Sequence, residues 1–375
     1  MKDLPESDRS RNLTELLTNL INFLINYSSY LSLIFIPLLA ADLGASDFQV
    51  GVAVSAYGTA FLVSSLFFGR KSDSRGRLGY VRWGCLAVSF AFFSQVFASS
   101  VLLLVLSRFS VGFALGIAAA ALLAYVYEAV GHVGKFSSYG SLGWIFAALT
   151  AGLLKEYDLL FLSSGGLCLL AFILTWKLKE SRKEGRVSPP LLLPVIRRNF
   201  QIYLAVFLRH LGAQSVWAVL PLYLVWLGAD KFWVGILSGI NFTVQFFAMR
   251  FVERFSAWKV FAFGQVVSIL VFLAYSAATH FSQLFVVQPF LGIAWSCLYV
   301  GALLIVMGSG EEKGTAGGIF QSTLNLCSAL GPFIGGAIAH GFGYRGVMLF
   351  AVFIGVAGLF TALPGTRKVP KEAVR

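Results

Sequence analysis

Long apolar stretches recur along almost the whole chain, and short polar segments separate them. A helix needs roughly 20 mostly apolar residues to cross the hydrocarbon core of a bilayer. Strands of a membrane barrel would be about half that length and would alternate apolar with polar residues, so the stretches predict helices. We expect twelve transmembrane helices, at about 14–41, 47–69, 78–99, 101–128, 135–155, 158–178, 200–228, 232–251, 257–279, 281–308, 314–340 and 343–364.

The longest polar break lies at residues 177–199 and contains seven Lys or Arg residues. It also contains Pro189-Pro190, a pair that a membrane helix would not tolerate, because each proline removes a backbone N–H donor. We therefore expect a cytoplasmic linker here, between an N-terminal six-helix bundle at 1–176 and a C-terminal six-helix bundle at 200–375.

The two halves share an internal repeat. A set of residues recurs with a constant offset of 184 positions: Pro37-Leu38, Leu43-Gly44-Ala45, Phe48, Val50 and Gly51 return as Pro221-Leu222, Leu227-Gly228-Ala229, Phe232, Val234 and Gly235. Parallel repeats of this kind are typical of transporters, whose binding site lies between the repeats.

Composition and charge agree with a membrane location. Hydrophobic residues make up 58% of the chain and charged residues 12%, against about 25% charged in a soluble domain. If both termini are cytoplasmic, 24 of the 29 Lys and Arg residues lie on the cytoplasmic side, as the positive-inside rule requires. The other five are Lys155, Lys231 and Arg345 on the far side, and Arg108 and Arg209 within spans. We expect an integral protein of the cytoplasmic (plasma) membrane, with the lipid bilayer rather than nucleic acid as its partner.

The chain lacks the patterns of catalytic and metal sites. The four cysteines and four histidines are isolated from one another, and there is no HExxH motif and no Walker loop. We predict no catalytic residue, no metal site and no cofactor.

The segment between the second and third expected spans carries the most specific motif. Gly69, Asp73, Gly76 and Arg77 match a G-x-x-x-D-x-x-G-R pattern. This loop resembles the signature loop of the major facilitator superfamily, and the resemblance extends over nearly the full chain. It implies an all-α, twelve-helix fold of two pseudo-symmetric six-helix bundles, and secondary transport.

The resemblance also implies a gate. Asp73 would bind the start of the eleventh span at 314–316, where helix N–H groups carry partial positive charge, and so hold the cytoplasmic side shut. The alternative is an ordinary basic turn. The weaker copy in the second half, at 250–254, keeps an acid and a basic neighbour but loses the glycines. The expected gating residues are Gly69, Asp73, Arg75, Gly76, Arg77, Glu128, Glu253 and Arg254.

Arg108 lies inside the fourth span and precedes Gly112 and Gly116 at four-residue spacing. An intramembrane arginine is costly and faces the protein interior or an aqueous cavity, and the glycines allow another helix to approach. The pattern resembles the arginine motif of proton-coupled members of the superfamily. However, no Asp or Glu lies in the middle of any expected span, so the sequence shows no carboxylate for proton coupling.

Polar residues follow helical faces in repeat-related spans. Asn26 and Tyr30 align with His210 and Gln214 at the 184-residue offset, and each pair has i, i+4 spacing. These faces predict a central pathway, although interhelical hydrogen bonding is an alternative for each amide. His210 is either a proton carrier or a neutral core histidine. The expected pathway residues are Asn22, Asn26, Tyr30, Arg108, Arg209, His210, Gln214, Trp217, Asn241, Gln288, Trp295, Gln321 and Asn325.

These features predict a monomeric secondary transporter that moves a small organic solute by alternating access. Export of a drug-like or amphipathic metabolite is the leading interpretation. An organic anion, drawn by Arg108 and Arg209, is a close alternative, and sugar transport is a third. Coupling to protons and uncoupled facilitation share this architecture, and a channel or a receptor is a further alternative.

Overall fold

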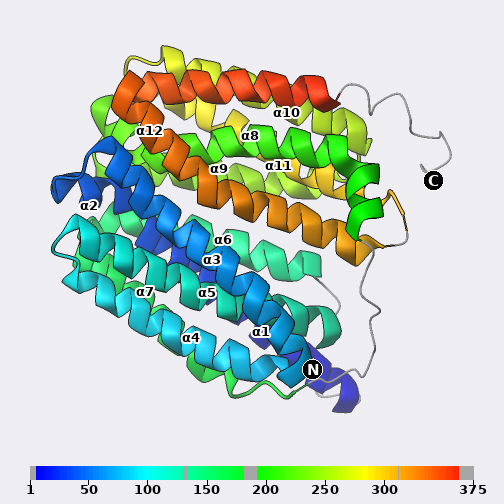
Figure 1. Ribbon diagram of the computed structural model, residues 1–375. Helices are drawn as coiled ribbons and strands as arrows, with labels where there is room; N and C mark the ends of the chain where they lie inside the picture. Colours follow the sequence, from blue (N-terminus) through cyan, green and yellow to red (C-terminus); the bar gives the residue numbers. More distant parts are fainter. Residues whose placement is uncertain (1–5, 130–132, 181–191, 311, 363–375) are drawn as a thin grey trace.

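The computed structural model describes residues 6–129, 133–180, 192–310 and 312–362, which form helices, short turns and no strand (Figure 1). The first half contains α1 Glu6–Leu33, α2 Ile36–Asp42, α3 Asp47–Arg75, α4 Arg77–Ser94, α5 Val101–Ala129, α6 Val133–Leu154 and α7 Tyr157–Thr175. The second half contains α8 Leu192–Trp226, α9 Lys231–Val252, α10 Ala257–Ala277, α11 Leu284–Met307 and α12 Lys313–Ala362. Short 3₁₀ turns, Gln95–Phe97 and Phe281–Gln283, follow α4 and precede α11.

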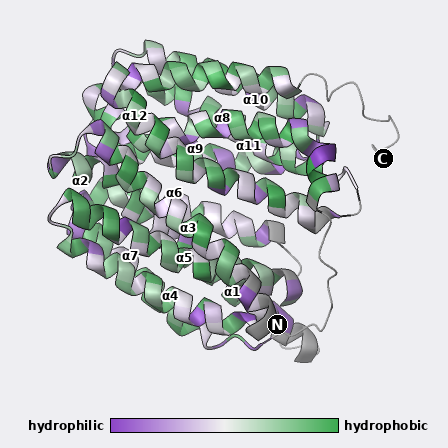
Figure 2. Ribbon diagram, viewed as in Figure 1, coloured by the Kyte–Doolittle hydropathy of each residue, from purple (hydrophilic) through white to green (hydrophobic). Residues whose placement is uncertain are grey.

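Within the described residues, nine helical segments are long and apolar enough to cross a membrane. Hydrophobic positions recur along all the helices (Figure 2). α12 turns back at Gly343, so its two arms run antiparallel as the eleventh and twelfth expected spans do. α4 and α6 are not among these nine segments. The predicted all-α membrane fold is confirmed.

Several helix boundaries differ from the sequence prediction, and α3 extends to Arg75, through most of the expected signature loop. The first expected span is broken after Leu33, and Pro37 lies in the first turn of α2, where a missing N–H costs no hydrogen bond. α8 begins at Leu192, so the end of the expected linker is helical. Asn199 explains part of this extension, because its amide nitrogen donates to Ser309 Oγ at 2.8 Å and ties the first turns of α8 to the end of α11.

The helices pack as two bundles that meet along two seams. In the first bundle α1 packs on α6 and α7, and α5 packs on α3 and α4. In the second, α8 packs on α12, and α11 packs on α9 and α10. Between the bundles, α3 packs on α12 and α6 packs on α9. The seams are themselves repeat-related, since α3 corresponds to α9.

The repeated sequence folds into repeated turns. Gly44 and Gly228 both adopt positive φ, +81° and +93°, a conformation that glycine reaches without steric cost. Two residues later, Ser46 and Asp230 each cap the next helix by accepting a backbone N–H with the side chain. We call the end of the molecule that holds these turns the repeat-turn end, and the opposite end, where α7 ends and α8 begins, the linker end.

Among the described residues, the hydrophobic core is continuous between the halves only at the repeat-turn end. There, one cluster joins Leu31 and Phe35 of the first half with Val219 and Leu237 of the second. The buried clusters at the linker end each draw on one half, residues 17–178 or residues 195–362. In Figure 1 the ribbons of α3 and α12 diverge toward the linker end. The described conformation is thus closed at the repeat-turn end.

Candidate functional site

Two pairs of glycines close the repeat-turn end. Gly51 of α3 lies against Gly336 of α12, and an added Cβ on Gly51 would lie 2.8 Å from Gly336 Cα. Gly235 of α9 lies against Gly152 of α6, with the corresponding distance 2.7 Å. The two pairs are related by the 184-residue offset. Glycine is required here because the backbones are too close for any side chain.

An ion pair reinforces this closure at the surface. Lys155 Nζ lies 2.9 Å from Asp230 Oδ2, and Lys231 Nζ donates to the Lys155 carbonyl at 3.1 Å. The Lys231 ammonium also lies 3.6 Å from the centroid of the Tyr157 ring. The hydrogen bond from Lys155 lowers the pKa of Asp230 below its usual 3.8. These contacts connect the end of α6 and the start of α7 with the start of α9.

Deeper in the interface, three aromatic rings bridge the halves. Phe242 of α9 makes an edge-to-face contact with Tyr30 of α1, with ring centroids 4.8 Å apart. It also lies 5.5 Å from the ring of Trp144 on α6. Such contacts favour offset or perpendicular rings. They form an apolar floor between the repeat-turn closure and the separated linker end.

The signature loop forms a tight connection at the linker end. Gly76 has φ +95° between α3 and α4. Arg77 forms a bidentate pair with Glu128, at 2.6 Å for Nη2 and 3.1 Å for Nε, and its Nη1 donates to Ser72 Oγ. Glu180, just after α7, accepts the Arg77 backbone N–H at 2.8 Å and so caps α4. The structure therefore brings together α3, α4, α5 and α7.

The remaining gating candidates have fewer described contacts. The side chains of Asp73 and Arg75 lie outside the described residues, so the expected contact of Asp73 with the start of α12 stays a prediction. Gly69 packs near Ala120 of α5. Glu253 is exposed after α9, and Arg254 lies over the Phe251 ring at 5.4 Å.

Arg108 is fully buried in the first half. Its Nη1 donates to Ser32 Oγ and Gln95 Oε1, both at 3.2 Å. Its guanidinium lies over the Tyr57 ring at 4.8 Å. Gly112, one turn on, lets the α3 backbone approach at Tyr57. Nε and Nη2 have no hydrogen-bond partner among the described residues.

Arg209 is also fully buried, in the second half. Its Nε donates to Ser268 Oγ at 2.7 Å, and its guanidinium lies 5.4 Å from the Trp295 ring and 5.6 Å from the Phe272 ring. Nη1 and Nη2 have no partner among the described residues. Both arginines therefore lie behind aromatic rings, and neither is exposed in this conformation.

His210 forms the centre of an aromatic cluster. Its ring stacks on Trp295 of α11 at 4.8 Å and meets Trp217 edge-on at 5.7 Å. Gln214 Nε2 lies 3.1 Å from His210 Nε2 and donates to Ser328 Oγ of α12 at 2.9 Å. An amide nitrogen can only donate, so His210 Nε2 accepts and the neutral ring carries its hydrogen on Nδ1, which is unpartnered.

The asparagines of α1 contact α6 of the same half. Asn22 Nδ2 donates to the Phe136 carbonyl at 2.7 Å, and Asn26 Nδ2 donates to Asn22 Oδ1 at 2.9 Å. Both amides lie against Gly140. The buried Asn22 amide thus serves interhelical hydrogen bonding, while Asn26 is half-buried.

The other amides lie along single helices of the second half. Asn241 Oδ1 accepts from Gln245, and both residues are buried on α9. Gln288 of α11 is buried, and its Oε1 has no hydrogen-bond partner in the described part of the chain. Asn325 Oδ1 accepts from Gln321 at 3.3 Å on α12, where Gln321 is exposed toward the linker end. These four amide residues and Gln288 therefore lie on three different helices and do not form one cluster.

Several residues of these sites were not predicted from the sequence. The partners of the arginines are Ser32, Gln95 and Ser268. Each serine is a single polar residue between apolar neighbours, Gln95 directly follows Ser94, and none of the three carries a distinguishing pattern. Glu180 is likewise one acid among linker charges. The glycine pairs did leave a signal, because Gly152 and Gly336 are separated by the repeat offset of 184 residues.

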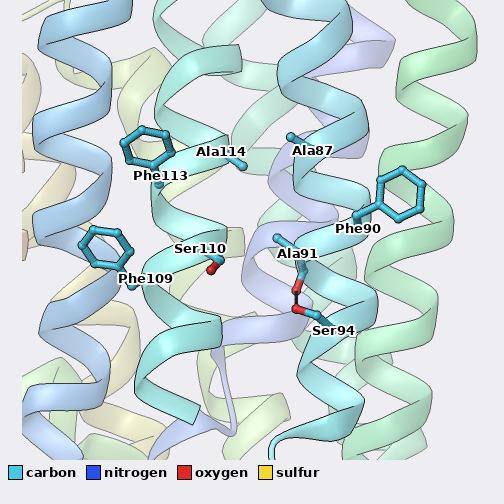
Figure 3. A pocket seen from close by; sticks show the side chains of 8 residues that line it. All are labelled: Ala87, Phe90, Ala91, Ser94, Phe109, Ser110, Phe113 and Ala114. Atoms are coloured by element: carbon cyan, nitrogen blue, oxygen red, sulfur yellow. Dashed lines mark hydrogen bonds between the residues drawn. The ribbon is translucent and has the colours of Figure 1, made fainter. Parts of the chain in front are cut away.

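A groove between α4 and α5 lies apart from these residues (Figure 3). Its wall is apolar apart from two serines, each of which donates to its own helix backbone. It is lined by Ala87, Phe90, Ala91, Ser94, Phe109, Ser110, Phe113 and Ala114. Phe90 and Phe109 are exposed, so the groove opens on the outer surface of the first bundle and has no part in the interface between the halves.

Comparisons with known proteins agree with this architecture. A profile of the Major Facilitator Superfamily matches residues 18–244 and 202–375. The chain is 23% identical to quinolone resistance protein NorA of Staphylococcus aureus (strain COL), over 84% of this chain and 87% of that protein. It is 26% identical to multidrug resistance protein MdtG of Citrobacter koseri, over 91% of each.

Among solved structures, a bacterial homologue of the human lysosomal transporter Spinster, in an inward-facing and occupied conformation, superposes with a TM-score of 0.82. That match has 14% sequence identity and covers 98% of each chain. With the profile match over nearly the whole length, the chain belongs to the major facilitator superfamily and is an integral membrane carrier, a secondary transporter rather than an enzyme.

Proposed function

We propose that this carrier exports a small amphipathic organic compound from the cytoplasm by alternating access. The observation that carries the proposal is the asymmetry of the interface, which is sealed by glycine pairs at the repeat-turn end and divided into separate cores at the linker end. A carrier needs two such seals that open in turn. The names of the relatives NorA and MdtG, which refer to drug resistance, support the direction and the amphipathic substrate.

In this proposal the linker end faces the cytoplasm and both termini are cytoplasmic. The support is the distribution of basic residues, 24 of 29 on that side. The described conformation is then inward-facing, which is the state named for the Spinster homologue. We propose that the protein works as a monomer, because each chain holds both halves of the interface.

The proposed pathway lies between the two bundles, above the aromatic floor of Tyr30, Trp144 and Phe242. Aromatic surface would hold the apolar body of the substrate, and amides would orient its polar groups. Its wall in the second half is the cluster of His210, Trp217 and Trp295. In the first half, the proposed wall includes Asn26 of α1, which is half-buried and aligns with His210 in the repeat.

The gate at the linker end is proposed from the signature loop. The Arg77 and Glu128 pair positions the loop within the first half, and Asp73 would bind the start of α12 when the linker end closes. Glu253 and Arg254 would form the weaker, repeat-related contact on α9.

The proposal is tested with the purified full-length protein in liposomes that contain a pH-sensitive dye. Anionic, neutral and cationic fluorescent amphiphiles are offered, and protein-dependent flux and proton movement are recorded together. Flux that saturates and is stimulated by substrate on the opposite side is expected of a carrier. Flux with a pH change indicates proton coupling, and flux without one indicates a facilitator or exchanger. Absence of flux for every compound contradicts the proposed export.

A further inference from the structure

Fixed charge inside the membrane-spanning part of this protein has one sign. Arg108 and Arg209 are both fully buried within helices. The acidic residues with described side chains lie at or near the ends of the expected membrane spans or outside them, among them Glu15, Asp42 and Glu128. The interior therefore carries positive charge without a carboxylate beside it.

The two guanidinium groups are also short of hydrogen-bond acceptors. Arg108 lacks partners for Nε and Nη2, and Arg209 lacks partners for Nη1 and Nη2, among the described residues. Their described partners, Ser32, Gln95 and Ser268, are neutral. Burial of a charge without a counter-charge is unfavourable, and an anion that reaches such a group gains both attraction and hydrogen bonds.

The two arginines differ in which residues lie between their guanidinium groups and the interface of the two halves. Arg108 is covered by Tyr57, and its neighbours are helices of the first bundle. Arg209 lies under Trp295, whose ring also stacks on His210. His210 Nδ1 is a further unpartnered donor in the same cluster. The second bundle thus combines an aromatic surface, a buried cation and a free N–H donor.

We infer that the transported compound carries an acidic group, a carboxylate or sulfonate, on an aromatic or apolar body, and that Arg209 and His210 attract this group while Trp295 packs on the body. The inference rests on the proposed export function. Arg108 adds to the positive field from the other half. The buried position of the two charges weakens screening by salt.

The inference is opposite to binding of cationic drugs. A positive field near the site raises the local concentration of anions and lowers that of cations. At a separation of about 8 Å and an effective dielectric constant of about 20, one fixed charge separates the affinities of ligands of opposite sign by roughly a thousandfold, so tenfold is a conservative threshold once screening is included. An exporter with this buried positive charge therefore selects its substrates by charge as well as by shape.

The test measures competition against whichever fluorescent amphiphile the liposome screen shows to be transported. Naphthalene-1-sulfonate, 1-naphthalenemethanol and trimethyl-1-naphthylammonium share one ring system and differ in charge. We expect the sulfonate to inhibit at a concentration at least about tenfold lower than the ammonium compound does. Equal or stronger inhibition by the cation, or no inhibition by any of the three, overturns the inference while the carrier function stands. Absence of any transported amphiphile overturns the proposed function itself.

Arginine variants locate the charge. Arg209→Gln is expected to reduce the anion preference at least fivefold, and Arg209→Lys is expected to retain most of it because the charge remains. Arg345→Gln is the matched control, since Arg345 also lies over a tryptophan, Trp226 at 5.3 Å, but at the repeat-turn end. An unchanged preference in Arg209→Gln overturns the assignment to Arg209. If that variant does not fold, loss of the preference in Arg209→Lys overturns it instead.

Discussion

The two ends of this carrier are held by different kinds of contact. At the repeat-turn end, backbone meets backbone across the halves, through Gly51 with Gly336 and Gly152 with Gly235. At the linker end, the described pair of Arg77 with Glu128 lies within one half. Contacts between halves must be broken in every transport cycle, whereas contacts within a half can be permanent. The difference indicates that the repeat-turn end is a seal and that the linker end contains braces for each bundle.

The largest expected effect comes from filling a glycine contact. In Gly51→Val, the new Cβ would lie 2.5 Å from the Pro332 carbonyl oxygen and 2.8 Å from Gly336 Cα, and neither backbone atom can rotate away. We expect the sealed conformation to lose about 3 kcal/mol, or about a hundredfold in population. Spin-label distances across the repeat-turn end measure the opening, and liposome flux measures the consequence.

Gly166→Ala is the control, because nothing lies within 4 Å of the Cβ position on Gly166. It is expected to leave both the distances and the flux unchanged. A sealed repeat-turn end in Gly51→Val would contradict the role of the glycine pair.

A smaller effect is expected from the brace at the linker end. Glu128→Gln removes the charge from a partly buried bidentate pair with Arg77. We expect the stability of the first bundle to fall by about 1–2 kcal/mol, measured as a lower unfolding temperature in detergent. The spin-label distance across the repeat-turn end should not change. If it does change, the brace and the seal are coupled, and the two ends do not act independently.

Arg198 and Glu312 provide the comparison for this brace. They form a pair at 2.8 Å at the linker end of the second bundle, but both side chains are more exposed. Glu312→Gln is therefore expected to change stability by no more than a few tenths of a kcal/mol.

The ion pair across the seal should have a still smaller effect. Asp230→Asn removes the charge that faces Lys155, while Asn keeps the helix cap on α9. Both side chains are largely exposed, so we expect the open conformation to gain only about 0.5 kcal/mol, roughly twofold in population. Lys155→Gln should produce the same shift, and the double variant should add little to either. Fully additive shifts would show that the two residues act separately.

The sequence predicted the architecture far better than the site. Apolar runs identify the helices, and the 184-residue repeat relates the two halves, because both patterns can be read along the chain without knowing which helices meet. The partners of Arg108 and Arg209 depend on which helix faces reach them, and serine or glutamine in an apolar run gives no sign of that. Pro37 shows that helix boundaries are limited in the same way. The sequence alone does not tell whether the proline interrupts the first span or begins a new helix, because that depends on where the chain turns.

The smallest expected effect is a dependence of the seal on external pH. The hydrogen bond from Lys155 lowers the pKa of Asp230 in the sealed conformation, so the stabilisation is complete above 3.8 and is lost as the pH falls through the lowered pKa. Between pH 8 and pH 5 we therefore expect no change in the spin-label distance across the repeat-turn end, and below about pH 4 a slight opening. Because the Asp230 side chain is 58% exposed, solvent screening limits this to a few tenths of a kcal/mol. Asp230→Asn should abolish the acid response, and a transition centred near pH 6 that survives in this variant would assign the pH dependence to another group, such as a histidine.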